Sequence, residues 1–177
     1  RNFLGAPPQG RADYAFFQHI LKSLNPKTGR CAILFPHGVL FRNEEKDMRE
    51  KLIKSDLVEC VIGLGPNLFF NSPMEACIVI CRTQKEVNRR GKVLFINALN
   101  EVTRKNAESY LEDAHIKRIA DSYQNFDSEN YFATVATLSD IEKNNFSLSI
   151  PLYVKNDTTV AYQDTRSLNE CVADWLE

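Results

Sequence analysis

The sequence predicts an α/β domain: half of an α/β sheet with an antiparallel edge, flanked by helices. Helical periodicity over 13–24 and 44–54 alternates with short apolar runs typical of strands, which lie at 31–35, 57–62, 76–82 and 92–96. The connection between 57–62 and 76–82 carries no helical pattern. A parallel crossover normally needs a helix, so we expect these two strands to pair antiparallel.

The first helix is expected over 13–24, with Asp13 as its N-cap. Its apolar residues recur at helical spacing, at Phe17, Ile20, Leu21 and Leu24. After a turn, the uninterrupted apolar run 31–35 predicts a strand buried on both faces. The strand stops at Pro36-His37-Gly38, in the manner of strands that end at a ligand crevice.

The second helix is expected over 44–54, with Met48 and Leu52 facing inward. Oppositely charged residues on it are spaced i,i+4, namely Glu45/Arg49, Asp47/Lys51 and Glu50/Lys54. Strands at 57–62, 76–82 and 92–96 follow, which completes the expected half-sheet.

Beyond residue 100 the sequence becomes more polar, and we expect a mostly helical extension over 101–177, separate from 1–100. Ser139 and Glu142 have the spacing of a capping box. Apolar residues alternate over 146–154, which predicts a half-buried extended segment. A last helix is expected at 168–176 from the common face of Leu168, Cys171, Val172, Trp175 and Leu176.

Composition limits the possible functions. The 177 residues are 44% hydrophobic and 25% charged, which is ordinary for a globular domain, and the net charge is -1. DNA contact would therefore need a local surface or a partner. We expect no membrane association, because no apolar run approaches the length of a span. Cys77 and Cys81 would lie about 13 Å apart on a strand, too far to share a metal ion, so no metal site is predicted.

Few residues are candidates for chemistry. His37 either lines a crevice or sits in a turn bonded to the backbone, and we favour the turn. Phe69 and Phe70 follow a Gly-Pro-Asn loop; such a pair is core by default, but a loop aromatic can also stack on an extruded base. The loop "GLGP" at 63–66 ends in proline and precedes no helix, so it is not a dinucleotide fingerprint.

Taken together, several stretches resemble the modification subunit of type I restriction–modification systems. They are "GRADYAFFQHILKSL", "GRCAILFPHGVLFR", "MREKLIKSDLVECVIGLGPNLFFNSPMEACIVICR", "GKVLFINA" and "NNFSLSIPLYV", in the order and spacing of that family. Each is weak alone, whereas the ordered set is specific and reaches to about Val154. The chain resembles the C-terminal portion of such a subunit.

The resemblance implies the C-terminal half of a Rossmann-like, mostly parallel methyltransferase sheet with an antiparallel edge strand. It also implies methyl transfer from S-adenosylmethionine to adenine N6 in DNA. The implied partners are DNA, a specificity subunit and a restriction subunit, in a prokaryotic cytoplasm, with 101–177 as a subunit-docking extension. The family's Gly-rich cofactor motif and Asn-Pro-Pro-Phe/Tyr tetrad are not in this sequence. No catalytic residue is therefore assigned to it.

Two aromatic positions carry over from the family. Phe16, in the helix before the central strand, matches the aromatic that borders the adenine of the cofactor. Phe69 matches the aromatic that stacks on the target base, with Phe70 as the alternative register. Pro36, His37 and Gly38 then form a wall of the crevice between these two positions.

Two other functions compete with this interpretation. The chain could be a non-catalytic module that docks on a specificity subunit through the residues after 100. It could also be an unrelated α/β enzyme that uses His37, although nothing supplies His37 with a nucleophile or cofactor.

Because the cofactor motif is missing, we predict that residues 1–177 alone do not bind S-adenosylmethionine at micromolar concentrations. Isothermal titration of the cofactor into the purified chain, with its mass verified, measures this directly. Binding at micromolar affinity would show that a cofactor site lies within these residues.

Overall fold

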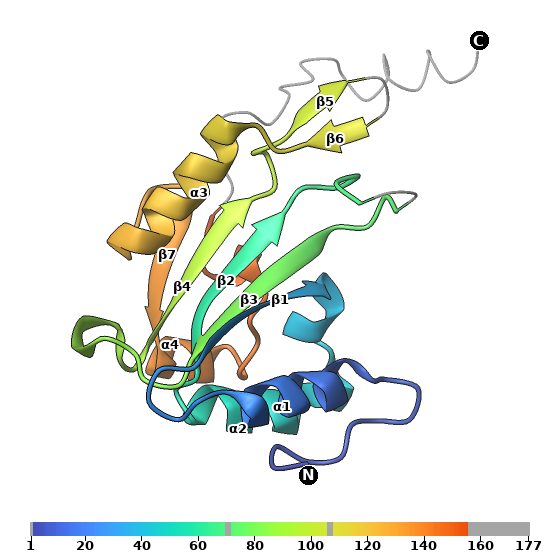
Figure 1. Ribbon diagram of the computed structural model, residues 1–177, viewed down its shortest axis with the longest axis vertical. Coiled ribbons are helices and arrows are strands. Elements are labelled where there is room, and N and C mark those ends of the chain that lie inside the picture. The colour runs from blue at the N-terminus through green and yellow to red at the C-terminus, as the bar shows by residue number, and fades with distance from the viewer. Residues whose placement is uncertain (1, 70–71, 106–107, 156–177) are drawn as a thin grey trace, which may run out of the picture.

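A computed structural model describes residues 2–69, 72–105 and 108–155 (Figure 1). The helices are α1 (Asp13–Ser23), α2 (Lys46–Lys54), α3 (Asp113–Asn125) and α4 (Leu138–Lys143), with short 3-10 turns at His37–Leu40, Asn43–Glu45, Val87–Arg89 and Ile150–Leu152. The strands are β1 (Arg30–Pro36), β2 (Val58–Leu64), β3 (Ala76–Arg82), β4 (Lys92–Ala98), β5 (Thr103–Lys105), β6 (Glu108–Tyr110) and β7 (Ala133–Thr137). The expected 168–176 helix lies outside the described residues.

Five strands form one sheet in the order β1-β3-β2-β4-β7, while β5 and β6 form a separate hairpin. The predicted antiparallel pairing of the 57–62 and 76–82 segments is confirmed as β2 with β3. However, β3 lies inside the sheet, between β1 and β2. The two edge strands, β1 and β7, each pair antiparallel with their neighbour.

The sheet differs from the mostly parallel one that was expected. Of the four neighbouring pairs described, only β2 and β4 run parallel. Because β1 and β2 are both antiparallel to β3, they still point the same way, as does β4. The carboxyl ends of β1, β2 and β4 therefore lie at the same end of the sheet, the upper end in Figure 1.

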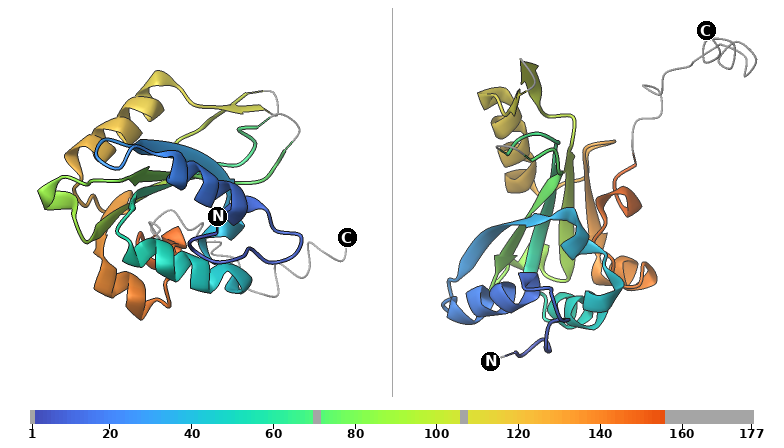
Figure 2. Two further views of the ribbon diagram at one scale, coloured as in Figure 1. Left: turned by 60° about the horizontal axis from the view of Figure 1, so that its bottom comes forward. Right: turned by 90° about the vertical axis from the view of Figure 1, so that its right-hand side faces the viewer.

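The two faces of the sheet are covered differently. One face is packed by α1, α2 and α4 together with residues 146–154, and the large core there includes Phe17, Leu52, Val79 and Ile141. On the other face α3 covers β2 and β4, with Ile119 and Tyr123 packed on a smaller core. Figure 2 shows α3 and α4 on opposite sides of the sheet.

The prediction that β1 is buried on both faces is wrong. Burial alternates along the strand: Phe35 is buried, whereas Ala32 and Leu34 are exposed, Leu34 to 49%. Cys31, Ile33 and Phe35 point to the large core, and α3 does not reach the opposite side of β1. The apolar run of β1 has the same composition as a strand covered on both faces. Its sequence alone does not show which of its faces another element covers.

Helix boundaries are close to those expected, but two local details are wrong. Ala12, not Asp13, is the N-cap of α1, and Asp13 instead pairs with Arg42 at 2.9 Å. The capping box of α4 is formed by Thr137 and Asp140 rather than by Ser139 and Glu142. Thr137 serves as the N-cap of α4 because its backbone, at the end of β7, is extended, which is the conformation that an N-cap needs.

Part of the region after residue 100 belongs to the sheet and to the core beneath it. Strand β7 pairs with β4, and Phe146, Leu148, Ile150 and Val154 are buried in the large core. The expected boundary at residue 100 therefore falls between two strands that belong to the same core-forming unit. Of the alternating residues, Leu152 is an exception, since a 3-10 turn leaves it half exposed.

Arg49 holds the chain together across a long sequence distance. Its side chain is only 1% exposed; its Nε donates to the Phe146 carbonyl at 2.8 Å and its Nη1 donates to the Arg42 carbonyl at 3.0 Å. Glu45 is buried beside it, and this burial raises the pKa of the Glu45 carboxyl. One buried guanidinium thus ties α2 to the segment that follows α4.

A second polar cluster fixes α3 to the sheet. Glu59 is fully buried at an irregularity in β2 where the pairing register shifts, and it accepts a hydrogen bond from the Tyr123 hydroxyl at 2.5 Å. Burial and the adjoining Glu59 carboxylate raise the pKa of Tyr123 to about 12. Arg89 lies 3.7 Å from Glu59 and stacks over the Tyr123 and Phe126 rings.

Replacing Arg49 with methionine should lower the free energy of unfolding by about 2–4 kcal/mol, because one buried and one partly buried carbonyl lose their donor. Lys51→Met on the exposed side of the same helix is the matched control, with a change within about 0.5 kcal/mol. Urea unfolding of both variants measures the difference. Equal losses would show that Arg49 does not have this role.

Candidate functional site

An open pocket of about 500 Å³ lies at the carboxyl end of β1, and it contains Pro36, His37 and Gly38. The remaining lining residues come from the following turn and from the β2–β3 connection; they are Arg42, Pro66, Pro73, Met74 and Glu75. The three residues predicted as a crevice wall thus share one concave surface with the loop that carries Phe69.

His37 is tied to the backbone of the neighbouring strand. Its Nε2 lies 2.9 Å from the Ala76 carbonyl oxygen, and because a carbonyl only accepts, Nε2 carries the proton and donates. Its Nδ1 lies 3.6 Å from a Glu75 carboxylate oxygen. With Nε2 occupied by the first residue of β3, His37 fixes the end of β1 to β3. This geometry agrees with the favoured prediction of a turn histidine.

Gly38 leaves room for the side chain of an arginine. A Cβ added there would lie 2.5 Å from Arg42 Nε and 2.7 Å from its Nη2. Arg42 in turn donates from Nη1 to Asp13 at 2.9 Å and lies 3.5 Å from the buried Glu45. This arrangement joins the Pro36-His37-Gly38 turn to the start of α1.

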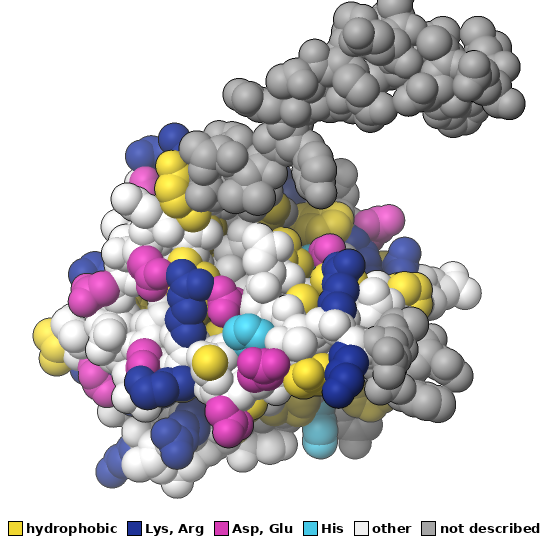
Figure 3. Space-filling view, turned by 90° about the horizontal axis from the view of Figure 1, so that it is seen from above, with side chains coloured by type: hydrophobic (Ala, Val, Ile, Leu, Met, Phe, Trp, Pro, Cys, Tyr) yellow, Lys and Arg dark blue, Asp and Glu magenta, His cyan; other side chains and the backbone are white. Residues whose placement is uncertain are grey.

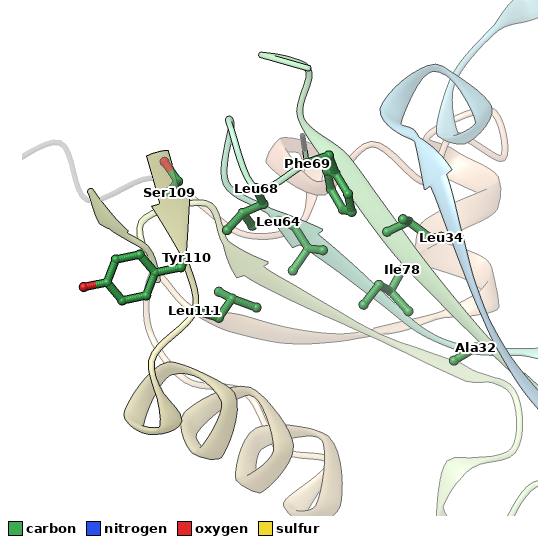
Figure 4. A pocket seen from close by; sticks show the side chains of 9 residues that line it. All are labelled: Ala32, Leu34, Leu64, Leu68, Phe69, Ile78, Ser109, Tyr110 and Leu111. Carbon is green, nitrogen blue, oxygen red and sulfur yellow. The ribbon is translucent and has the colours of Figure 1, made fainter. Parts of the chain in front are cut away.

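Phe69 lies in a second, apolar pocket of about 550 Å³ (Figure 4). Its ring points down over the sheet toward Leu34 and Ile78, and Leu111, which follows β6, points toward the same space. Phe69 is half-buried and packs on the smaller core. In this structure it therefore meets apolar side chains, and it does not line the pocket that contains His37.

The predicted aromatic positions are not gathered in one place. Phe16 projects from α1 with 65% of its surface exposed and lines neither pocket. Phe70 lies outside the described residues. The structure therefore joins Pro36, His37 and Gly38 to each other, and it leaves Phe16 and Phe69 apart from them.

Gly65 fixes the base of the loop that carries Phe69. A Cβ on Gly65 would come within 2.7 Å of the Leu99 carbonyl oxygen and 2.6 Å of Val102. Because one of these neighbours is backbone, no side chain fits there without movement of the chain. The β2–β3 connection thus starts directly beneath the segment that leads to the β5–β6 hairpin.

Cationic and anionic side chains are interspersed over the upper end of the molecule, wherever described residues form that surface (Figure 3). Charge of mixed sign does not give the extended positive field that binds a DNA backbone on its own. Among the described residues, no cluster of three or more His, Cys, Asp or Glu side chains is placed to hold a metal ion. None of the helices described is long and apolar enough to span a bilayer.

Sequence reasoning missed several lining residues. Arg42 lies four positions after Gly38, and no local pattern indicates that its side chain packs against that glycine. Ser109, Tyr110 and Leu111 line the Phe69 pocket, yet nothing in their local pattern indicates it. They reach the pocket only because the β5–β6 hairpin folds back toward the β2–β3 loop.

His37→Ala should lower the free energy of unfolding by about 1 kcal/mol, because the Ala76 carbonyl loses its donor. His19→Ala, at an exposed position of α1, is the control and should change it by less than about 0.5 kcal/mol. Denaturant melts of the two variants compare them. An unchanged midpoint for His37→Ala would count against the anchoring role.

The sequence of this chain matches a known protein family. The N-6 DNA methylase family matches residues 1–161. The chain is 36% identical over 155 residues to the type I restriction enzyme MjaVIII methylase subunit of Methanocaldococcus jannaschii, and 33% identical over 162 residues to the HindI methylase subunit of Haemophilus influenzae. These matches cover 85% of this chain but only 26% and 35% of those proteins.

Solved structures of methyltransferase subunits are also similar to this chain. The type I restriction–modification methyltransferase subunit from Streptococcus thermophilus superposes with a TM-score of 0.78 at 36% identity, covering 84% of this chain and 31% of that one. The EcoKI M protein shares the fold, with a TM-score of 0.68 at 15% identity over 86% of this chain and 39% of the other. The chain spans about a quarter to two fifths of the length of these relatives. It belongs to the N-6 DNA methylase family.

Proposed function

We propose that this chain is part of a type I modification subunit that transfers a methyl group from S-adenosylmethionine to adenine N6 in DNA. The observation that carries the proposal is the 36% identity, over most of the chain, to both a type I methylase subunit and a solved methyltransferase subunit of the same system. The shared core and the carboxyl-end pockets are the parts of the methyltransferase that this chain supplies.

Within that enzyme, the chain forms part of the crevice that receives the target base. A base in duplex DNA has to leave the stack before its exocyclic amine can react, and aromatic stacking then holds it. Phe69, with Phe70 as the alternative, is the proposed stacking residue, and Pro36, His37 and Gly38 are the proposed wall. The Phe69 ring points toward Leu34 and Ile78. The base would therefore stack on the ring face that is turned away from these residues, or the loop would have to move.

The chain contributes little to cofactor binding by itself. The exposed Phe16 ring is suited to cover one face of an adenine, and this is the only contact with S-adenosylmethionine that we assign to these residues. When bound, the cofactor supplies the methyl group. The groups that orient the target amine, and the remainder of the cofactor site, are proposed to come from the part of the subunit outside 1–177.

The proposed partners follow from the same relationship. We assign DNA, a specificity subunit and a restriction subunit as partners of the complete protein, acting in a prokaryotic cytoplasm. A solved structure that concerns complex assembly of the type I system shares the fold, with a TM-score of 0.59 at 18% identity. The mixed charge at the upper end of the molecule agrees with a DNA affinity supplied largely by other subunits.

The second candidate is a docking role for residues 101–177 without chemistry of their own. It is favoured by apolar side chains that remain exposed after residue 100, among them Ile116, Tyr131 and Leu152. The two functions are compatible within one complete subunit. The methyltransferase role predicts that changes at Phe69 alter methylation by the complete subunit, whereas a docking role for 101–177 alone predicts that they do not.

Phe69→Ala in the complete subunit, assembled with its specificity subunit, should reduce adenine methylation on the order of tenfold, since base stacking on an aromatic ring contributes about 1–3 kcal/mol. The measurement is the rate of N6-methyladenine formation in DNA, followed by mass spectrometry. Val87→Ala, at a residue that is 81% exposed, is the control.

Phe69→Leu separates stacking from packing. Leucine keeps the apolar contacts with Leu34 and Ile78 but lacks a planar ring. If Phe69 stacks on the base, Phe69→Leu should reduce the methylation rate about as much as Phe69→Ala does. Normal rates with leucine and reduced rates with alanine would assign Phe69 to packing. Normal rates with both variants, and reduced rates with Phe70→Ala, would move the stacking role to Phe70.

A further inference from the structure

The β5–β6 hairpin and the loop with Phe69 lie on two sides of one pocket. Ser109 and Tyr110 of β6 line the pocket of about 550 Å³ together with Phe69 (Figure 4). The hairpin forms a two-stranded sheet of its own at the upper end of the molecule, where β2 and β4 end (Figure 1). It is therefore the described element that faces Phe69 across the pocket.

One cationic residue of the hairpin lies on its pocket side. In Figure 4 the Tyr110 ring points away from Phe69, whereas Leu111 points into the pocket. Side chains alternate along an extended chain, so Ser109 shares the face of Leu111. Arg104 is the cross-strand partner of Ser109, and directly opposite residues of an antiparallel pair project to the same face. Arg104 therefore belongs to the face of the hairpin that is turned to the pocket.

The Arg104 side chain is exposed, and no hydrogen bond or ion pair joins it to another residue in the part of the chain that the structure describes. The neighbouring cations of α3, Lys117 and Arg118, by contrast both pair with acidic side chains. Lys105 is also exposed and unpaired among the described residues, but the alternation turns it to the other face of the hairpin. A guanidinium offers several donors in a planar fork that matches the oxygens of a phosphate. An apolar pocket with such a cation at its rim suits a ligand that joins an apolar ring to a phosphate.

We infer that Arg104 binds a phosphate next to the extruded adenine and thereby positions the target nucleotide over the Phe69 pocket. The inference rests on the proposed function, in which the base leaves the duplex and stacks on Phe69. A base and its flanking phosphates are joined through one sugar, so the backbone of that nucleotide passes the rim of the pocket on the side of Arg104. Phosphate contacts fix the orientation of a nucleic acid without reading its sequence. Arg104 thus contributes affinity and orientation, and it does not select the target sequence.

Arg104→Gln and Lys105→Gln are a matched pair of variants, because each removes one exposed positive charge from the same strand. In the complete subunit, assembled with its specificity subunit, Arg104→Gln should weaken the binding of target DNA on the order of tenfold, since a charge-assisted hydrogen bond is lost. It should also reduce the slope of log K against log salt concentration by about 1. Lys105→Gln should change the affinity by less than about threefold, because solvent and salt screen a charge that touches no phosphate. Fluorescence anisotropy over a range of salt concentrations measures both quantities.

Chemically modified DNA locates the contact. A neutral methylphosphonate replaces the phosphate on one side of the target adenine and, in a second DNA, the phosphate on the other side. At one of these positions the modification should weaken binding by the wild type and by Lys105→Gln, yet weaken binding by Arg104→Gln no further. A loss of affinity through misfolding would instead multiply with the effect of the modification at both positions.

Three results would overturn the inference: wild-type affinity of Arg104→Gln for target DNA, equal weakening by Arg104→Gln and Lys105→Gln, or losses that multiply at both modified positions. Formation of N6-methyladenine by the wild-type assembly on unmodified DNA is measured alongside. Normal methylation together with any of the three results would remove only the role of Arg104. Target DNA that is bound but not methylated by the wild type would remove the proposed function, and the inference with it.

Discussion

The insertion of β3 between β1 and β2 is the constraint on which the rest of the structure depends. All seven residues of β3 pair with β1, and β3 also pairs antiparallel with β2. This double ladder makes β1 and β2 point the same way and brings their ends to one side of the molecule. The His37 hydrogen bond to Ala76 then closes the junction where β1 ends and β3 begins. The β2–β3 connection, with Phe69, has to cross the same end.

The sequence was most informative where local pattern and topology agree. The range 76–82 was predicted to the residue, and its antiparallel pairing followed from a connection without a helix. Strand β7 was missed because "ATVAT" has little apolar character, and it is recruited to the sheet by pairing with β4. The open side of β1 was missed because Leu34 gives no local sign of whether a distant segment covers it. Burial of a strand face depends on tertiary partners, which its own residues do not encode.

The site was less predictable than the fold, for a related reason. Pro36, His37 and Gly38 are adjacent in sequence, so the end of one strand suffices to place them together. Phe69 depends on a loop whose course is determined by Gly65 beneath the Leu99 carbonyl and by neighbours from the β5–β6 hairpin. Contacts of that kind arise between segments with no common local pattern. The buried clusters around Arg49 and Glu59 were equally hidden, because charged residues in a helix or strand are usually exposed.

The ends of β1 restrict what its free edge can accept. Pro36 closes the strand with a residue that has no amide hydrogen to donate, and Arg30 opens it with an exposed charge. Because Pro36 has no amide hydrogen, no hydrogen bond can be donated from the outer edge of β1 at that residue. An apolar edge is ordinarily a site of aggregation, and a charged residue and a proline at its ends are the usual protection against it.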